Sequence, residues 1–306
     1  MRGSLSPRRV FLIPIFVPLG EKGPMPSTVR VRVPATSANL GPGFDALGVA
    51  LQLANTVTVR RATASSDDAM AAEAAAAFFK TARTKSFAFG WEIGGDVPRS
   101  RGLGSSVTVR LGLLHALNRL AGAPLDDERL YRLCAELEGH PDNAAPAAFG
   151  GFTVARPDGS YQRFRVAPTL RFALLIPDFE VRTADARRVL PKQVPFPAAV
   201  HSAGNAAAIA AAFASRNYAA LRDCFADGLH QPYRASLVPG LDKIIAAGVK
   251  AGAVGGWLSG SGSTIACLVL GDAMPVAAAM KRASPFKTAV TAIAAPDNRG
   301  VVVKES

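Results

Sequence analysis

A glycine-rich loop that leads directly into an amphipathic helix constrains this chain more than any other feature of its sequence. Residues 102–106 read Gly-Leu-Gly-Ser-Ser, and apolar positions in residues 107–120 then recur at helical spacing until Gly122 and Pro124 end the pattern. Glycines let backbone amides approach an anion closely, and the positive end of the helix adds to the attraction. The loop therefore predicts a phosphate site, where Ser105 and Ser106 offer hydroxyls to phosphate or to magnesium.

The same loop also fits a purely structural role. Gly-Leu-Gly then only allows tight packing, and Ser106 is an ordinary N-cap of the helix. The loop is not a Walker A motif, because no Gly-Lys-Ser/Thr follows, and the His-Arg-Asp and Asp-Phe-Gly signatures of protein kinases are absent. The loop alone does not decide between a phosphate site and a purely structural turn.

Three more loops carry polar side chains among turn-forming residues. Residues 34–45 hold Asn39 and Asp45 between glycines and prolines, and residues 138–143 read Glu-Gly-His-Pro-Asp-Asn after a helix end. Residues 258–263 read Leu-Ser-Gly-Ser-Gly-Ser and precede a buried strand. Each has a structural alternative: Asn39 and Asp45 can bond the backbone of their own loop, residues 138–143 can be a surface loop, and residues 258–263 a plain turn.

Strands and helices mix without strict alternation along the chain, which indicates an α+β fold rather than a doubly wound sheet. With 306 residues, of which 49% are hydrophobic, the chain can build one or two domains. Strands are expected at residues 28–33, 56–60, 86–93, 152–156, 172–176 and 264–270. Helices are expected at residues 69–80, 107–120, 126–138, 204–215, 218–226 and 240–250, and residues 34–48 are expected to form a shaped loop.

The charge and the cysteines bear on partners and compartment. The net charge is +12, but the basic residues are scattered in short groups such as residues 60–61 and 187–188, with few aromatic residues between them. This distribution favours a generally basic surface over a nucleic-acid or membrane partner. Cys134, Cys224 and Cys267 lie far apart, which is typical of a reducing cytoplasm and does not suggest a disulfide framework or a zinc site.

The first 27 residues differ from the rest of the chain. Residues 10–19 are mostly apolar, but Pro14 and Pro18 interrupt them, no small-x-small cleavage site follows, and ten residues are too few for a membrane-spanning helix. Regular patterning begins only at Thr28, so residues 1–27 are expected to be a flexible extension, with Met25 as an alternative start.

Together, and in this order, the four loops resemble those of the GHMP small-molecule kinases. Residues 102–106 are similar to the phosphate loop of that family, and residues 259–263, Ser-Gly-Ser-Gly-Ser, to its third motif. Residues 37–45, 138–143 and 229–234 are similar to those of homoserine kinases in particular. The resemblance runs from about Val29 to the C-terminus. Ser263 stands where the family pattern has proline, and residues 201–205 depart from the usual asparagine-bearing segment, which leaves fine substrate details open.

The resemblance implies a two-domain GHMP kinase fold. Residues 28–165 would form a ribosomal-S5-domain-2-like, ATP-binding N-terminal domain, and residues 166–306 a ferredoxin-like C-terminal domain. The implied reaction moves the γ-phosphate of ATP, with Mg²⁺, to the hydroxyl of L-homoserine in threonine biosynthesis. The sequence leaves the oligomeric state open, with a homodimer as one option.

The resemblance also implies roles for individual residues. The positions expected to contact ATP are Pro98, Arg99, Ser100, Arg101, Gly102, Leu103, Gly104, Ser105, Ser106, Val107 and Thr108. Ser106 and Glu138 would bind the metal, with Glu136 as the alternative to Glu138. The positions expected to surround homoserine are Asn39, Asp45, His140, Asn143, Arg187 and Arg234.

Three of these positions, Asp45, Asn143 and Arg187, are expected to be catalytic. Asn143 stands where several relatives carry a catalytic carboxylate, and its amide can orient the hydroxyl but cannot take its proton. Asp45 is the nearest group to accept or steer that proton, and steering is preferred because phosphoryl transfer depends mainly on positioning and charge neutralisation.

Two other functions remain open at this stage. One is a GHMP kinase for another small alcohol, against which Arg187 and Arg234 argue because guanidinium groups suit an amino-acid carboxylate. The other is a basic nucleic-acid-binding protein, since half of this fold also occurs in ribosomal proteins and fold does not decide function.

Overall fold

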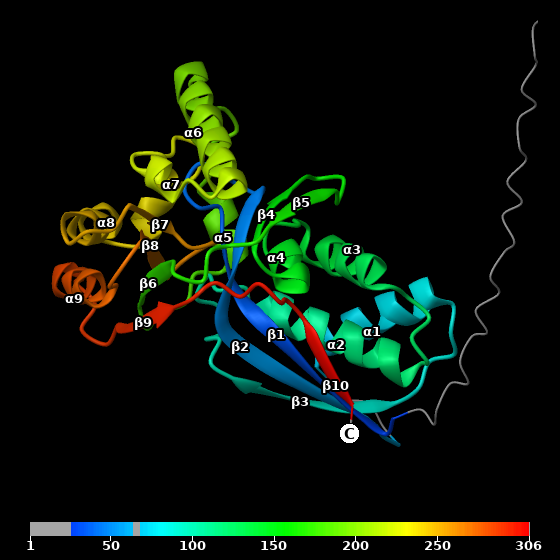
Figure 1. The fold of residues 1–306 in the computed structure, drawn as a ribbon. Coiled ribbons are helices and arrows are strands. Elements are labelled where there is room, and N and C mark those ends of the chain that lie inside the picture. The colour runs from blue at the N-terminus through cyan, green and yellow to red at the C-terminus, as the bar shows by residue number, and fades with distance from the viewer. Residues whose placement is uncertain (1–25, 64–67, 306) are drawn as a thin grey trace, which may run out of the picture.

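The computed structural model describes residues 26–63 and 68–305, so nearly all of the expected N-terminal extension lies outside the described residues. Two antiparallel sheets organise the described chain (Figure 1). In the first sheet the strands follow the order β10-β1-β2-β4-β5, with β3 also paired to β2, and the second sheet has the order β7-β8-β6-β9. The α+β class is therefore confirmed.

The first sheet carries its helices on one face (Figure 1). Val29, Val31 and Val33 alternate along β1 and are fully buried against the leucine face of α2, which explains why both patterns are visible in the sequence. The strands are β1 (Thr28–Ala38), β2 (Leu47–Arg61), β3 (Phe89–Gly95), β4 (Phe152–Ala155), β5 (Tyr161–Phe164) and β10 (Val302–Glu305). The helices are α1 (Ala69–Ala82), α2 (Ser105–Leu120), α3 (Asp127–Glu138) and α4 (Ala144–Phe149).

The second sheet packs α8 and α9 on one face and meets the first sheet with the other. At that junction the rings of Phe152 and Phe213 stack 4.1 Å apart, and Trp257 is fully buried. The strands are β6 (Arg171–Ile176), β7 (Gly255–Leu258), β8 (Ile265–Val269) and β9 (Val290–Ala294). The helices are α5 (Thr183–Arg188), α6 (Phe196–Ser215), α7 (Gln231–Arg234), α8 (Leu241–Lys250) and α9 (Met274–Ala283), with the 3₁₀ turns Tyr218–Leu221 and Ala235–Leu237.

The expected loop at residues 34–48 is wrong at both of its ends. β1 continues to Ala38 and β2 begins at Leu47, so only residues 39–46 turn. The register shifts between Pro34 and Ala35, and this bulge lets the polar half of β1 keep pairing with β2. The turn that remains carries Asn39 and Asp45.

Two of the expected helices also differ from the structure. The one expected at residues 204–215 begins earlier, at Phe196, with Pro197 in its first turn. The one expected at residues 218–226 is only the 3₁₀ turn Tyr218–Leu221. The first turn of α6 is exposed at Phe196, so no buried apolar position marks the start of this alanine-rich helix in the sequence.

The last strand returns to the first sheet. β10 pairs with β1, for example Val303 with Val31, although β9 before it belongs to the second sheet. The boundary at residues 165/166 stays a prediction, and any spatial division has to place β10 with the first unit. Among the described residues, the helices are all too short or too polar to cross a membrane. The three cysteines are free, with Cys134 and Cys267 buried.

Candidate active site

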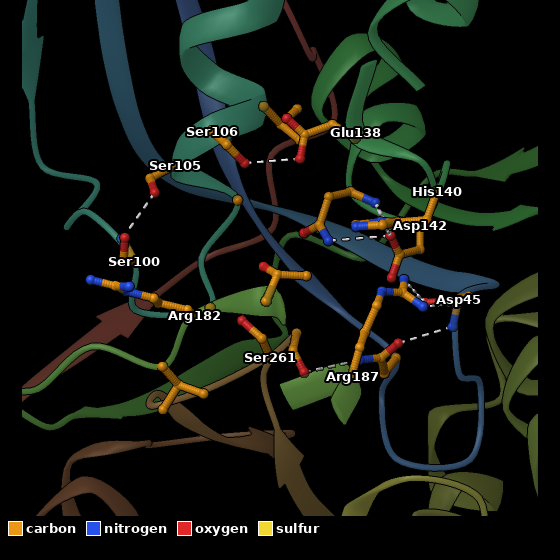
Figure 2. A pocket seen from close by; sticks show the side chains of 18 of the residues that line it. Asp45, Ser100, Ser105, Ser106, Glu138, His140, Asp142, Arg182, Arg187 and Ser261 are labelled. Carbon is orange, nitrogen blue, oxygen red and sulfur yellow. Dashed lines mark hydrogen bonds and ion pairs between the residues drawn. The ribbon is translucent and has the colours of Figure 1, made fainter. Parts of the chain in front are cut away.

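A polar cavity lies where the two sheets meet, and the four loops singled out in the sequence converge on it (Figure 2). The turn at residues 39–46, the glycine-rich loop before α2, the segment at residues 138–143 and the turn between β7 and β8 supply most of its wall. The lining residues are Asn39, Asp45, Ser100, Gly102, Gly104, Ser105, Ser106, Val107, Glu138, His140, Asp142, Asn143, Val181, Arg182, Thr183, Arg187, Arg234, Gly260 and Ser261.

The glycine-rich loop presents the N-terminus of α2 to this cavity. Gly104 is the N-cap residue, with a left-handed φ of 69°, and no side chain of the described residues caps the helix. A Cβ atom at Gly104 would lie 2.2 Å from Thr36 Oγ1, so only glycine fits. Because the first amides of an α-helix have no partner within the helix, those of α2 are available to an anion in the cavity.

Ser106 and Glu138 meet at the edge of this loop (Figure 2). Ser106 donates a hydrogen bond of 2.9 Å to Oε2 of Glu138, and Arg110 pairs with the other carboxylate oxygen. A hydroxyl and a carboxylate oxygen are the hard donors that Mg²⁺ prefers. Glu136, the alternative ligand, is largely exposed, lies 4.0 Å from Arg129 and does not line the cavity, so Glu138 fits a metal role better.

Asn143 lies between the glycine-rich loop and His140. Its Oδ1 accepts a hydrogen bond of 2.6 Å from Thr36, which leaves the amide nitrogen to face Asp142 at 3.3 Å. Asp142 Oδ1 lies 2.6 Å from His140 Nδ1. Burial opposes a charge on His140. The hydrogen bond and negative charge of Asp142, together with the negative charges of Asp45 and Glu138, outweigh burial and raise the pKa of His140. The protonated ring is therefore favoured more than in a free imidazole, and Nε2 is the ring nitrogen that Asp142 does not use.

Asp45 and Arg187 form a two-pronged ion pair across the cavity (Figure 2). Each carboxylate oxygen of Asp45 accepts a hydrogen bond of 3.0 Å from Arg187. Asn39 stabilises the turn with two hydrogen bonds. Its Oδ1 accepts one from the backbone N–H of Asp45, and its Nδ2 donates one to the Gly260 carbonyl. Asn39 thus has the backbone-bonding role that the sequence allowed, and it also lines the cavity. A metal ion would also fit the spacing of three other side chains. One carboxylate oxygen each of Asp45 and Asp142 and one ring nitrogen of His140 lie within 4.8 Å of one another.

Arg234 is the most buried cation of the cavity, with 2% of its surface exposed. Its Nε donates to the Ala186 carbonyl at 3.0 Å and its Nη1 to the Gly260 carbonyl at 3.1 Å. The ring of Phe44 lies 5.0 Å from the guanidinium carbon. Burial lowers the pKa of Arg234 to about 10. Since the protein acceptors of its hydrogen bonds are neutral, Arg234 is suited to an anionic ligand.

Comparisons with known proteins identify the family. The family model for the GHMP kinases N terminal domain matches residues 69–151, and the one for the GHMP kinases C terminal matches residues 209–285. The homoserine kinase of Caldicellulosiruptor bescii is 41% identical over 258 residues, which cover 79% of this chain and 84% of that protein. The chain belongs to the homoserine kinases of the GHMP family.

Other relatives extend the match over nearly the whole length. The homoserine kinase of Moorella thermoacetica is 36% identical over 89% of this chain and 99% of its own. A crystal structure of homoserine kinase from Cytophaga hutchinsonii superposes with a TM-score of 0.84 at 27% identity, over 92% of this chain and 99% of that one. Mevalonate kinase from Methanococcus jannaschii has a TM-score of 0.66 at 14% identity and shares the fold alone. The kinase fold predicted from the four loops is confirmed.

A second cavity, of about 470 Å³, adjoins the first and shares Ser100, Ser105 and Ser106 with it. Its remaining wall is mostly apolar: Asn55, Asp68, Met70, Trp91, Ile93, Gly94, Gly95, Val97, Arg99 and Val109. The apolar part of this cavity was not predicted from the sequence, because Trp91 and Ile93 read only as part of a strand. The Gly94-Gly95 pair at the end of the strand was the available signal in the sequence, and the structure leaves Ile93 beside it partly exposed.

Other residues are placed differently from the expectation. Pro98, Arg101, Leu103 and Thr108 were expected at ATP but line neither of these two cavities. Arg101 turns its side chain to the Pro177 carbonyl at 3.1 Å and to Asp178, and Leu103 is fully buried. Figure 2 shows Arg182 and Ser261 in the first cavity, which Thr183 also lines, and none of the three was among the expected site residues. No motif surrounds Arg182 and Thr183, whereas Ser261 belongs to the turn at residues 258–263 that the sequence singled out.

Proposed function

We propose that this chain transfers the γ-phosphate of ATP to the hydroxyl of L-homoserine, producing O-phospho-L-homoserine for threonine biosynthesis. The observation that carries the proposal is a single cavity that contains both an uncapped helix N-terminus and the buried guanidinium of Arg234. The first suits a phosphate, and the second suits the carboxylate of a small amino acid. The identity to curated homoserine kinases points to the same pair of substrates.

The ATP phosphates would lie on the amides that begin α2, with the base in the adjoining apolar cavity. Ser100, Ser105 and Ser106 belong to both cavities and would contact the phosphates between them. Ser106 and Glu138 would hold Mg²⁺, which when bound neutralises charge on the phosphates. Arg110 keeps Glu138 in place through the oxygen that Ser106 does not use.

Homoserine would be recognised by its charged ends. Arg234 would bind the carboxylate, and the Asp45–Arg187 pair offers an anion for the ammonium group next to a second cation. The raised pKa of His140 favours an imidazolium there, whose free N–H would donate to an anionic oxygen of either substrate. Recognition of both charged ends would exclude alcohols of similar size that lack one of them. Mevalonate, for example, has a carboxylate but no ammonium group.

Catalysis would rest on position more than on a strong base. Asn143, fixed by Thr36 and Asp142, would orient the acceptor hydroxyl towards the phosphate loop. Asp45 already accepts two hydrogen bonds from Arg187, so it would steer the hydroxyl rather than take its proton. Phosphoryl transfer through a loose transition state requires mainly that the hydroxyl and the phosphate are aligned and that the negative charge is neutralised.

A coupled assay of ADP release tests the proposal directly. The protein, ATP and Mg²⁺ are combined with homoserine, threonine, serine or mevalonate, and we expect the highest kcat/KM with homoserine. No ADP release with homoserine, or a higher kcat/KM with mevalonate, would contradict the proposal.

A further inference from the structure

His230 connects two parts of the cavity through a buried hydrogen-bond chain. The residue is fully buried, and its Nε2 lies 2.7 Å from the Gly41 carbonyl oxygen. Its Nδ1 lies 3.3 Å from Nη1 of Arg234. A carbonyl can only accept a hydrogen bond and a guanidinium can only donate one. The partners therefore assign the neutral tautomer, with the proton on Nε2 and a lone pair on Nδ1.

The surroundings of His230 keep this tautomer in place. Asp227 Oδ2 accepts the backbone amides of His230 and Gln231, at 2.9 Å and 2.7 Å, and fixes the start of α7. Phe44 stacks on the imidazole with ring centroids 5.0 Å apart. The charged groups that act on the ring are Asp227, Arg234 and Asp45.

These groups oppose one another, and the neutral ring is favoured. Burial lowers the pKa of His230, Arg234 lowers it further, and the negative charges of Asp227 and Asp45 only partly offset this. A protonated ring would turn Nδ1 into a donor that faces the N–H of Arg234, and the bond between them would be lost.

We propose that His230 is a positioning residue, which in its neutral form ties the turn at residues 39–46 to Arg234 and so fixes the guanidinium for the acceptor carboxylate. The other acceptors that hold Arg234 are the carbonyls of Ala186 and Gly260, which belong to different segments and do not reach Gly41. His230 hydrogen-bonds both Arg234 and Gly41 of the turn carrying Asp45. It acts beside two other contacts with that turn, the ring of Phe44 against the guanidinium and the Gly260 carbonyl, which also accepts from Asn39. This role rests on the proposed recognition of homoserine by Arg234.

Three substitutions separate the two hydrogen bonds. His230→Asn places an amide oxygen near the position of Nδ1 and keeps an acceptor for Arg234, whereas His230→Gln places an amide N–H near Nε2 and keeps a donor for Gly41. His230→Leu removes both bonds while staying apolar. His201→Gln, at an exposed histidine of α6, is the matched control.

Steady-state kinetics with homoserine and with ATP as the varied substrate give the readout. We expect His230→Leu to raise KM for homoserine about tenfold, which corresponds to the loss of one hydrogen bond that holds the guanidinium, and to leave KM for ATP within about twofold. His230→Asn should return KM for homoserine to within about threefold of the wild type. His230→Gln should not, and His201→Gln should change neither constant.

Each opposite result overturns the positioning role. Equal changes in both KM values, or a lowered melting temperature with unchanged KM values, would make His230 a structural residue only. Rescue by His230→Gln instead of His230→Asn would assign the effect to Gly41 alone. If His230→Leu does not fold, the comparison of the Asn and Gln variants decides. A wild-type protein that is inactive on homoserine would contradict the proposed function itself, which separates the two failures.

Discussion

Arg187 and Arg234 line the same cavity but offer a ligand different electrostatics. Arg187 is partly exposed, and its charge is already matched by two hydrogen bonds to Asp45. Arg234 is buried, and its hydrogen bonds go to neutral carbonyls and to a neutral imidazole. A guanidinium that is removed from water without a bonded carboxylate gains more from an incoming carboxylate than one that is already paired.

Replacing Arg234 should therefore cost more than replacing Arg187. Losing one side of a desolvated charge pair typically costs about 2 to 5 kcal/mol, so Arg234→Leu should lower kcat/KM for homoserine by roughly 30-fold to several thousandfold. KM for ATP should hardly change, because the phosphate loop is untouched. Arg187→Leu, which also frees Asp45, is the matched comparison and should have the smaller effect. A folded Arg234→Leu variant within about threefold of the wild type would reject the carboxylate role.

At the scale of elements, the sequence predicted those with a strong periodic pattern and missed those fixed by neighbours. Helices α2 and α3 carry regular apolar faces and were placed nearly to the residue, and Asp126 is the N-cap of α3. α5 and β10 are short, and neither has enough turns or alternations to produce a pattern of its own. These two elements are fixed by packing against their neighbours. Because Arg187 lies in α5, its position could not be predicted from a local pattern either.

The N-terminus of α2 leaves no room for a side chain at Gly104. Gly104→Ala puts a methyl group against Thr36 Oγ1 at a left-handed φ, so the loop must move and the amides at the helix start lose their common direction. We expect KM for ATP to rise more than tenfold, with a loss of several degrees in melting temperature. Gly271→Ala is the control, because a Cβ there meets nothing within 4 Å. Unchanged ATP affinity in Gly104→Ala would mean that the phosphates bind elsewhere.

At the scale of the whole molecule, the site depends on how the two sheets dock. Trp257 Nε1 donates to Ser37 Oγ at 3.0 Å, and Ser37 Oγ lies 2.8 Å from Ser259 Oγ. Ser259 in turn donates to the carbonyl of Gly102 in the phosphate loop at 2.6 Å. This chain of contacts joins residues more than 200 positions apart. The sequence could name the loops by their residues, but not the distances between them or the second cavity, since these arise only when the sheets pack.

The acid sensitivity of the fold should depend on His115. This residue of α2 is almost fully buried, its Nε2 has no hydrogen-bond partner among the described residues, and Asp127 lies 3.8 Å from its Nδ1. Burial lowers the pKa of His115 from 6.5 to about 4, despite the opposing charge of Asp127. The unfolded chain therefore binds a proton more readily than the folded chain between these two values, and folding is weakened as the pH falls through that window.

The expected size of this effect is measurable. The shift corresponds to at most about 3 kcal/mol of unfolding free energy, lost progressively from pH 6.5 down to pH 4. His115→Leu removes the titrating group, so its unfolding free energy should fall less over this range than that of the wild type. Urea unfolding at several pH values between 7.5 and 4 measures the difference, with the exposed His201→Leu as the control. Parallel curves for His115→Leu and the wild type would show that other groups set the acid limit of the fold.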